Sequence, residues 1–162
     1  AYPRLEIWMT ECSGGSWSTD YASNLVWNAD NLLVGSTKAY GSAIVLWNLA
    51  LDENGDPHLG GCSGCRGVIT VVGGTTRHEV EFDALGQIGA AVRPGARQVA
   101  LRGTGSAHAV AFRNTDGHNT LIAVNDGATS QRIRMQLGSW SFDDNIPPHS
   151  VVTWRWDALA GY

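Results

Sequence analysis

The chain has 162 residues, of which 43% are apolar and 16% are charged, and its formal net charge is −4 at pH 7. This length is enough for one domain and marginal for two, and the composition predicts a folded protein with a substantial core, not a disordered chain. Lysine occurs once, at Lys38, and the sequence has no cluster of Lys and Arg, so the basic patches that bind nucleic acid or anionic membrane surfaces are missing. No apolar stretch is long enough to span a bilayer, and we expect no signal peptide within these residues.

The first 60 residues predict a strand, a helix and a second strand. Residues 4–10 (RLEIWMT) form a mostly apolar run that is typical of a buried parallel strand, and residues 42–51 (SAIVLWNLAL) form another. Between them, residues 20–41 carry apolar side chains at helical spacing, namely Ala22, Leu25, Val26, Ala29, Leu32 and Leu33. A buried strand, a helix and another buried strand make a β-α-β unit.

The cysteines are Cys12, Cys62 and Cys65, and the close pair has C-x-x-C spacing. Such a pair can be a redox motif, half of a zinc site or a tight disulfide. A zinc site would need two more ligands, for which His58 and His78 are within reach in the sequence. A redox motif should lie at a strand-to-helix turn, whereas a strand-like run follows here. We favour a Cys62–Cys65 disulfide with Cys12 free, which indicates an oxidising compartment.

From about residue 66 the pattern becomes β. Residues 66–72 (RGVITVV) predict a strand, and residues 82–95 predict a short helix that Asp83 is placed to cap and Pro94-Gly95 to end. Five further apolar runs predict strands at residues 97–103, 107–114, 119–125, 130–137 and 150–156.

The turns between these runs favour an antiparallel β-sandwich. Residues 115–117 (TDG) and 126–127 (DG) predict hairpin turns, and short strands at this spacing are typical of a sandwich. Trp154 and Trp156 are two residues apart on one strand, so they would face the same side of the sheet, and we expect both in the core.

The predicted fold class is mainly β, an antiparallel sandwich preceded by the last β-α-β part of a (β/α)8 barrel. One β-α-β unit cannot close a parallel sheet, and a complete barrel takes about 250 residues. We therefore assign residues 1–65 to the C-terminal segment of a barrel and residues 66–162 to the sandwich domain. The short helix, near residues 83–91, is expected to pack back on the barrel.

Glu11 lies where the catalytic residues of a barrel lie, at the carboxyl end of a strand. Trp47 and Asn48 lie on the second apolar run, and an acidic loop, residues 52–56, follows them. A Trp face can stack on a sugar ring, an Asn can hydrogen-bond a hydroxyl, and a carboxylate can meet the anomeric carbon. Each residue also has an ordinary interpretation, Glu11 as a solvated surface residue and Trp47 as core. A calcium site in the loop is a weaker alternative, because its glycine has the wrong offset for an EF-hand.

Four motifs in this order resemble glycoside hydrolase family 30: TECSGGSW, LWNLALDENGDPHLG, GVITV and FDALGQIGAAVRPGARQV. This is a family of retaining β-glycosidases, and the resemblance covers nearly the whole chain. It implies that Glu11, at the end of the seventh barrel strand, is the nucleophile of a double-displacement mechanism. Trp17 keeps the family's six-residue spacing from the nucleophile, Trp47 lines the sugar subsite, and Asn48 lies next to it.

This chain differs from the family pattern at some positions, and the resemblance has consequences for activity, partners and location. Cys12 follows Glu11 directly, one position earlier than the family's cysteine, and the GCSGC loop at residues 61–65 points to a bacterial member. The family's acid/base Glu lies on the fourth barrel strand, which is not among these residues, so we expect this chain alone to be inactive. The expected partners are a carbohydrate substrate and the N-terminal part of the barrel, with no cofactor, metal, nucleic acid or membrane, and the expected location is secreted or extracellular.

A binding module is the alternative function. A sandwich that binds carbohydrate without catalysis should carry a flat row of exposed aromatic side chains, in which Trp140 could take part. Residues 66–162 show no obvious row of this kind, which favours the enzyme.

Overall fold

A computed structural model describes residues 5–103 and 108–157, so two ends of predicted strands, at Arg4 and Ala107, lie outside the described residues. The chain divides into two compact units, Ala1–Gly86 and Gln87–Tyr162. The sequence pattern puts a boundary after residue 65, whereas the first unit continues to Gly86, because the strands that follow residue 65 pair with a strand that precedes it.

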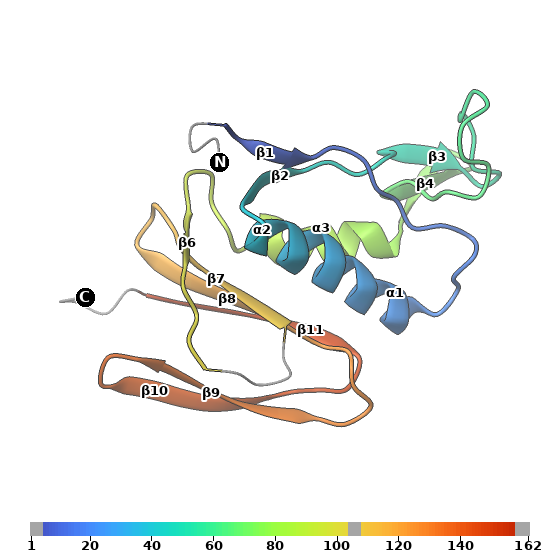
Figure 1. The fold of residues 1–162 in the computed structure, drawn as a ribbon. Helices are drawn as coiled ribbons and strands as arrows, with labels where there is room; N and C mark the ends of the chain where they lie inside the picture. The colour runs from blue at the N-terminus through green and yellow to red at the C-terminus, as the bar shows by residue number, and fades with distance from the viewer. Residues whose placement is uncertain (1–4, 104–107, 158–162) are drawn as a thin grey trace. The chain divides into compact units, whose positions relative to one another are not determined.

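The first unit begins with a β-α-β unit (Figure 1). Strands β1 (Ile7–Met9) and β2 (Gly41–Ile44) are parallel neighbours. Three helical segments connect them without a break: α1 (Tyr21–Trp27), the π-helical η1 (Asn28–Gly35) and α2 (Ser36–Lys38). The predicted helix and the predicted β-α-β unit are therefore confirmed.

The helix has a defined start and a buried apolar stripe. Asp20 caps it, because its carboxylate accepts a hydrogen bond from the backbone N–H of Ser23 at 2.8 Å. Of the positions in the predicted helical spacing, Val26, Ala29, Leu32 and Leu33 are buried, and Val34, outside that spacing, is buried with them.

Three more strands belong to the first unit: β3 (Ala50–Asp52), β4 (Ile69–Val72) and β5 (Thr75–His78). β3 and β4 are parallel, and β4 and β5 form an antiparallel hairpin. The prediction of one strand over residues 42–51 is wrong, because the backbone changes partners inside that run. The N–H of Trp47 bonds to the carbonyl of Cys12 at 2.8 Å, whereas the carbonyl of Asn48 accepts from the N–H of Val68 at 2.8 Å.

Helix α3 (Val80–Gly89) begins earlier than the sequence predicts. The predicted cap at Asp83 is wrong, because this residue lies in the first turn of the helix and its carboxylate accepts a hydrogen bond from the hydroxyl of Tyr21. That hydrogen bond raises the pKa of Tyr21 to about 12 and ties the first half of α3 to α1. Within residues 5–103 and 108–157, no helix combines the length and apolar character needed to cross a membrane.

The second unit is the predicted antiparallel β-sandwich. A four-stranded sheet in the order β11-β8-β7-β6 is covered by the hairpin β9–β10 (Figure 1). The strands are β6 (Arg97–Val99), β7 (His108–Arg113), β8 (His118–Asn125), β9 (Gln131–Leu137), β10 (Trp140–Ile146) and β11 (Ser150–Asp157). All five predicted strands are present, and β10 is an additional one. Its three consecutive polar residues, Asp143, Asp144 and Asn145, have low strand propensity, which is why the pattern missed it.

Only one of the two predicted hairpin turns joins neighbouring strands. Between β7 and β8, the N–H of Asn114 bonds to the carbonyl of His118 at 2.8 Å, and Gly117 has a φ of 85°, which glycine adopts readily. The second prediction is wrong. Asp126 and Gly127 follow β8 and lead to β9, a strand of the other sheet, so this turn carries the chain between the two layers.

The two tryptophans of β11 pack against β10 but are only half-buried, so the prediction that both lie in the core holds only in part. Trp156 stacks on Trp140 with a centroid distance of 6.2 Å, and Trp154 lies 6.3 Å from the ring of Phe142. The indole N–H of Trp154 donates to the carboxylate of Asp144 at 2.8 Å. The aromatic side chains of β10 and β11 therefore pack on one another and are partly buried.

A charged cluster lies at the β7–β8 turn. Asp116 accepts a hydrogen bond from the backbone N–H of His118 at 3.1 Å, and its carboxylate also lies 3.1 Å from the imidazole of that residue and 2.8 Å from the guanidinium of Arg155. These contacts, the backbone hydrogen bond first, lower the pKa of Asp116 from 3.8 to about 2.

Candidate active site

The carboxyl ends of β1 and β2 bring Glu11 and Trp47 close together. The parallel hydrogen bonding continues past both strands, because the N–H of Val45 bonds to the carbonyl of Met9 and the N–H of Trp47 to that of Cys12, each at 2.8 Å. Glu11 and Trp47 are therefore held on adjacent backbones. The side chain of Glu11 is exposed and that of Trp47 is half-buried.

A cavity of about 320 Å³ lies at this edge. Its lining consists of Glu11, Cys12, Ser13, Trp47, His58, Gly61, Cys62 and Cys65. We refer to it as the Glu11 cavity. It combines one carboxylate, one aromatic face and one imidazole, which are groups that can bind and process a polar ligand with an apolar face, such as a sugar.

The other two predicted site residues do not line this cavity. Asn48 lies beside Trp47 in the chain, but its side-chain oxygen accepts a hydrogen bond from the backbone N–H of Ala50 at 3.2 Å. Trp17 is 64% exposed and its ring lies over Gly15, where a Cβ atom would overlap it. The substrate-binding roles of Trp17 and Asn48 thus stay predictions, and neither side chain contacts the cavity directly.

The segment after Glu11 is paired with the loop that contains the close cysteines. The N–H of Ser16 bonds to the carbonyl of Gly64 at 2.8 Å, and the N–H of Arg66 bonds to the carbonyl of Gly14 at 2.9 Å. These bonds form an antiparallel bridge that joins residues far apart in the sequence. The backbone beside Glu11 is therefore fixed by the 61–66 loop as well as by its own strand.

A buried ion pair lies under this bridge. The Nη2 atom of Arg66 is 3.1 Å from Oε1 of Glu81, whose side chain is only 1% exposed, and Nη1 donates to the carbonyl of Ser18 at 3.1 Å. A Cβ atom on Gly14 would overlap the Glu81 carboxylate, so glycine is required for the backbone to pass this close. The pair links the segment after Glu11 to α3.

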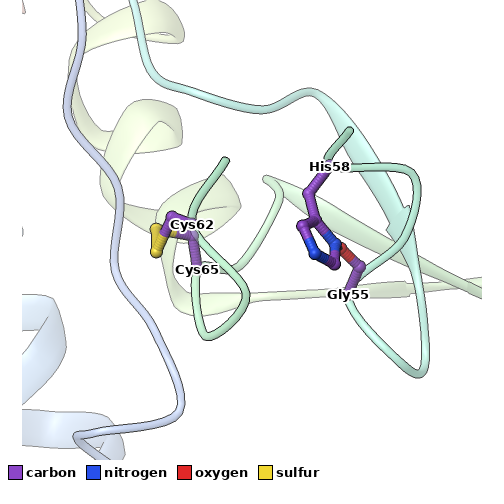
Figure 2. Close-up of a disulfide and its surroundings, with 4 residues drawn as sticks. All are labelled: Gly55, His58, Cys62 and Cys65. Atoms are coloured by element: carbon purple, nitrogen blue, oxygen red, sulfur yellow. A yellow bond between two sulfur atoms is a disulfide. The ribbon is translucent and has the colours of Figure 1, made fainter. Parts of the chain in front are cut away.

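The predicted disulfide is present between Cys62 and Cys65, and Cys12 is a free, half-buried cysteine. Figure 2 shows the disulfide and the ring of His58 on one loop between β3 and β4. Since both sulfurs are joined, this pair does not offer thiolates to a metal. In the part of the chain that the structure describes, no group of three or more His, Cys, Asp or Glu side chains is placed to hold a metal ion.

The acidic loop is a turn stabilised by its own first residue. The carboxylate of Asp52 accepts hydrogen bonds from the backbone N–H groups of Asn54 and Asp56, both at 2.8 Å. These bonds, that from Asp56 first, lower the pKa of Asp52. The calcium alternative loses its support, because this carboxylate is engaged with the loop backbone.

His58 is a cavity residue that the sequence did not assign to the sugar site. Its spacing from Cys62 suggested zinc, and nothing in the periodicity of an irregular loop indicates which way a side chain points. A glycine-rich loop directly after a predicted barrel strand was the available signal, because loops at that edge of a barrel carry the site residues.

Comparisons with known proteins identify a family domain within the second unit. Residues 95–154 match the family model described as the glycosyl hydrolase family 30 beta sandwich domain. The structure of the endo-beta1,6-glucanase BT3312 is similar with a TM-score of 0.87 and 27% sequence identity, over 96% of this chain and 36% of that one. The chain thus spans little more than a third of the length of that glucanase.

Two further solved structures share the fold. SrfJ from Salmonella typhimurium has a TM-score of 0.85 at 24% identity, over 96% of this chain and 36% of that one. The catalytic domain of the GH30 xylanase C from Talaromyces cellulolyticus has a TM-score of 0.72 at 22% identity, over 93% of this chain and 40% of that one. The matched sandwich domain confirms the predicted resemblance to glycoside hydrolase family 30 over residues 95–154, and these two structures, each below 25% identity, show that the fold is shared.

Proposed function

We propose that this chain carries the nucleophile side of a retaining β-glycosidase active site. The observation that carries the proposal is that Glu11 and Trp47, at the carboxyl ends of two paired parallel strands, line one cavity. Glu11 would attack the anomeric carbon of a β-linked sugar whose ring rests against Trp47. The glycosidic C–O bond would break as the glycosyl-enzyme ester forms, and water would then release the sugar with retained configuration.

The second carboxyl group would come from the rest of the enzyme. In a retaining enzyme an acid/base carboxyl lies about 5–5.5 Å from the nucleophile, protonates the leaving oxygen and later activates water. The exposed apolar side chains of the first unit support an association with the remainder of a barrel. They include Leu5, Ile7, Trp8, Val45 and Leu49, which lie on or beside the strands that carry the cavity.

The proposed substrates are β-linked glycosides or polysaccharides. The glucanase that resembles this chain at 27% identity is named for β-1,6-glucan, so β-1,6-gluco-oligosaccharides are the first substrates to test. Chromogenic β-glucosides and β-xylosides complete the set.

A binding module without catalysis has less support. Trp140, Phe142, Trp154 and Trp156 pack on one another between the two layers of the sandwich. Among the described residues of the second unit, the large apolar side chains that are well exposed are Val99 and Leu101, and neither is aromatic. A flat sugar platform on this unit would need exposed aromatic rings.

The disulfide supports a proposal about location. A Cys62–Cys65 bond persists in oxidising surroundings, so we place the protein outside the cytosol, as a secreted or extracellular enzyme. A bacterial source stays a prediction from the GCSGC loop.

Glu11→Gln in the enzyme that contains this chain tests the proposal. The change keeps the shape of the side chain and removes its charge, so we expect kcat to fall by about 10⁴-fold or more. In Glu11→Ala, which removes the carboxyl group and leaves space, added azide should restore turnover and give the α-glycosyl azide, because a small anion can reach the vacated face. A 2-deoxy-2-fluoro β-glycoside should label the wild type on the peptide that contains Glu11.

Glu6→Gln is the matched control, because Glu6 lies five positions earlier on the same segment, is exposed and does not line the cavity. It should keep normal turnover. Near-normal turnover of Glu11→Gln, or a label on another peptide, would show that Glu11 is not the nucleophile.

A further inference from the structure

His58 lines the Glu11 cavity but has no part in the proposed nucleophilic step. It lies on the loop between β3 and β4, and its side chain is 23% exposed. Figure 2 shows the ring turned toward the carbonyl of Gly55, on the loop that also carries the disulfide. The side chain is therefore held by its own loop and accessible from the cavity.

The two ring nitrogens of His58 have different surroundings. Nδ1 lies 2.8 Å from the carboxylate of Asp56 and 3.1 Å from the carbonyl oxygen of Gly55. Both neighbours are acceptors, so Nδ1 carries the proton and Nε2 of the neutral ring is an acceptor. Within residues 5–103 and 108–157, no protein group forms a hydrogen bond with Nε2.

An oriented imidazole with an open acceptor suits a particular ligand group. The loop fixes the ring through Nδ1, so the side chain is already ordered before a ligand binds and loses little conformational entropy on binding. Sugar hydroxyls are hydrogen-bond donors, and binding cavities fix the orientation of a ligand with a small number of such polar groups beside an apolar face. Trp47 supplies that face in the same cavity.

We propose that Nε2 of His58 accepts a hydrogen bond from one hydroxyl of the β-linked sugar bound in the Glu11 cavity, and that this contact selects among substrates. The inference rests on the proposed function, because it takes the cavity as the sugar site. His58 acts here as a binding residue, and the Asp56 carboxylate is a positioning group that keeps the proton on Nδ1.

His58→Phe tests the contact in the complete enzyme, because it keeps a planar ring and removes both nitrogens. The substrates are the aryl glycoside of the sugar that labels Glu11 and its monodeoxy analogues. We expect His58→Phe to lower kcat/KM on the parent glycoside by about 10-fold, the effect of one lost hydrogen bond. With the wild type, one monodeoxy analogue should have a kcat/KM about 10-fold below that of the parent glycoside. With His58→Phe, that analogue and the parent glycoside should have the same kcat/KM.

Two companion variants separate binding from folding. His78→Phe is the matched control, because His78 is exposed on β5, stacks on Phe82 at 3.6 Å and does not line the cavity. It should leave kcat/KM unchanged. His58→Gln can still accept a hydrogen bond through its amide oxygen, so it should recover part of the loss.

The wild type provides a readout that needs no variant. In ¹⁵N spectra of histidine-labelled enzyme, the Nε2 resonance of His58 should move when the glycoside binds, whereas its Nδ1 resonance should change little. Equal losses on every deoxy analogue, or normal kcat/KM for His58→Phe, would overturn the inference while leaving Glu11 labelling intact. If no glycoside labels Glu11, the proposed function fails and this inference fails with it.

Discussion

Removing the Arg66 side chain should destabilise the first unit more than any other single charge removal in the loop after β3. Arg66→Met keeps most of the length of the side chain but leaves the Glu81 carboxylate buried without its cation. Among the residues that the structure describes, the Oε2 atom of Glu81 has no hydrogen-bond partner, so the carboxylate has little other compensation. An ionised group in this position must be neutralised or exposed, and both cost free energy.

The size of the effect follows from burial. Breaking a buried pair by removing one partner costs about 3–5 kcal/mol. The lower end applies here, because the Arg66 side chain is 21% exposed although that of Glu81 is 1% exposed. The lost hydrogen bond from Nη1 to the carbonyl of Ser18 adds about 1 kcal/mol. We therefore expect Arg66→Met to lower the free energy of unfolding by about 4 kcal/mol.

Urea unfolding followed by tryptophan fluorescence measures this change, and a double-mutant cycle isolates the pair. Arg66→Met/Glu81→Met removes both charges, so it should be more stable than the single variant by about 2 kcal/mol. Arg77→Met is the control, because the Arg77–Glu79 distance of 2.9 Å is slightly shorter than the Arg66–Glu81 distance of 3.1 Å, but the Arg77 side chain is 66% exposed. This control should cost less than about 1 kcal/mol. Equal, small losses for Arg66→Met and Arg77→Met would refute the argument from burial.

Three further predictions concern other parts of the structure. Gly14→Ala should destabilise the chain by about 1–3 kcal/mol in the same unfolding assay, because its Cβ would overlap the buried carboxylate, whereas Gly86→Ala, with nothing within 4 Å, should be neutral or stabilising. The pKa of Asp116 is lowered from 3.8 to about 2, so its contribution to stability is present above pH 4 and lost as the pH falls toward 2. Asp116→Asn should remove that part of the acid transition, and an unchanged pH profile would contradict it. Alkylation without reductant should modify Cys12 alone, as read by peptide mass spectrometry, and labelling within the Cys62–Cys65 pair would rule out the disulfide.

The sequence was sufficient for the elements whose hydrophobic pattern repeats. The helix that begins at Tyr21 follows from apolar residues at helical spacing, and the strands of the sandwich follow from short apolar runs between turns. The closeness of Glu11 and Trp47 was also predictable, because the carboxyl ends of neighbouring parallel strands meet at one edge of a sheet.

The sequence was not sufficient where tertiary hydrogen bonds decide the local structure. Residues 42–51 form a mostly apolar run, yet the backbone leaves the β1–β2 ladder near Trp47 and joins β4 through Asn48. Nothing in the side-chain pattern marks such a change of partner. At Asp126-Gly127 the composition is that of a tight hairpin, but the next strand belongs to the other layer of the sandwich. A turn signal reports that the chain reverses or bends, and it does not report which strand comes next.

The surroundings of Glu11 likewise combine features that the sequence predicts with features that only tertiary contacts determine. The strand that carries Glu11 is visible in the sequence, but its position depends equally on the Gly14–Gly64 region, where two glycine-rich loops bond through their backbones. Backbone bonds between loops leave no trace in side-chain periodicity, and the Arg66–Glu81 pair beneath them joins residues whose charges look like ordinary surface charges in the sequence. A glycine is needed at position 14 because a buried carboxylate lies against it, and the carboxylate is tolerated because an arginine from the disulfide loop neutralises it. Each of these residues is needed because of the others, so the geometry beside Glu11 depends on both folded loops together and on no single sequence pattern.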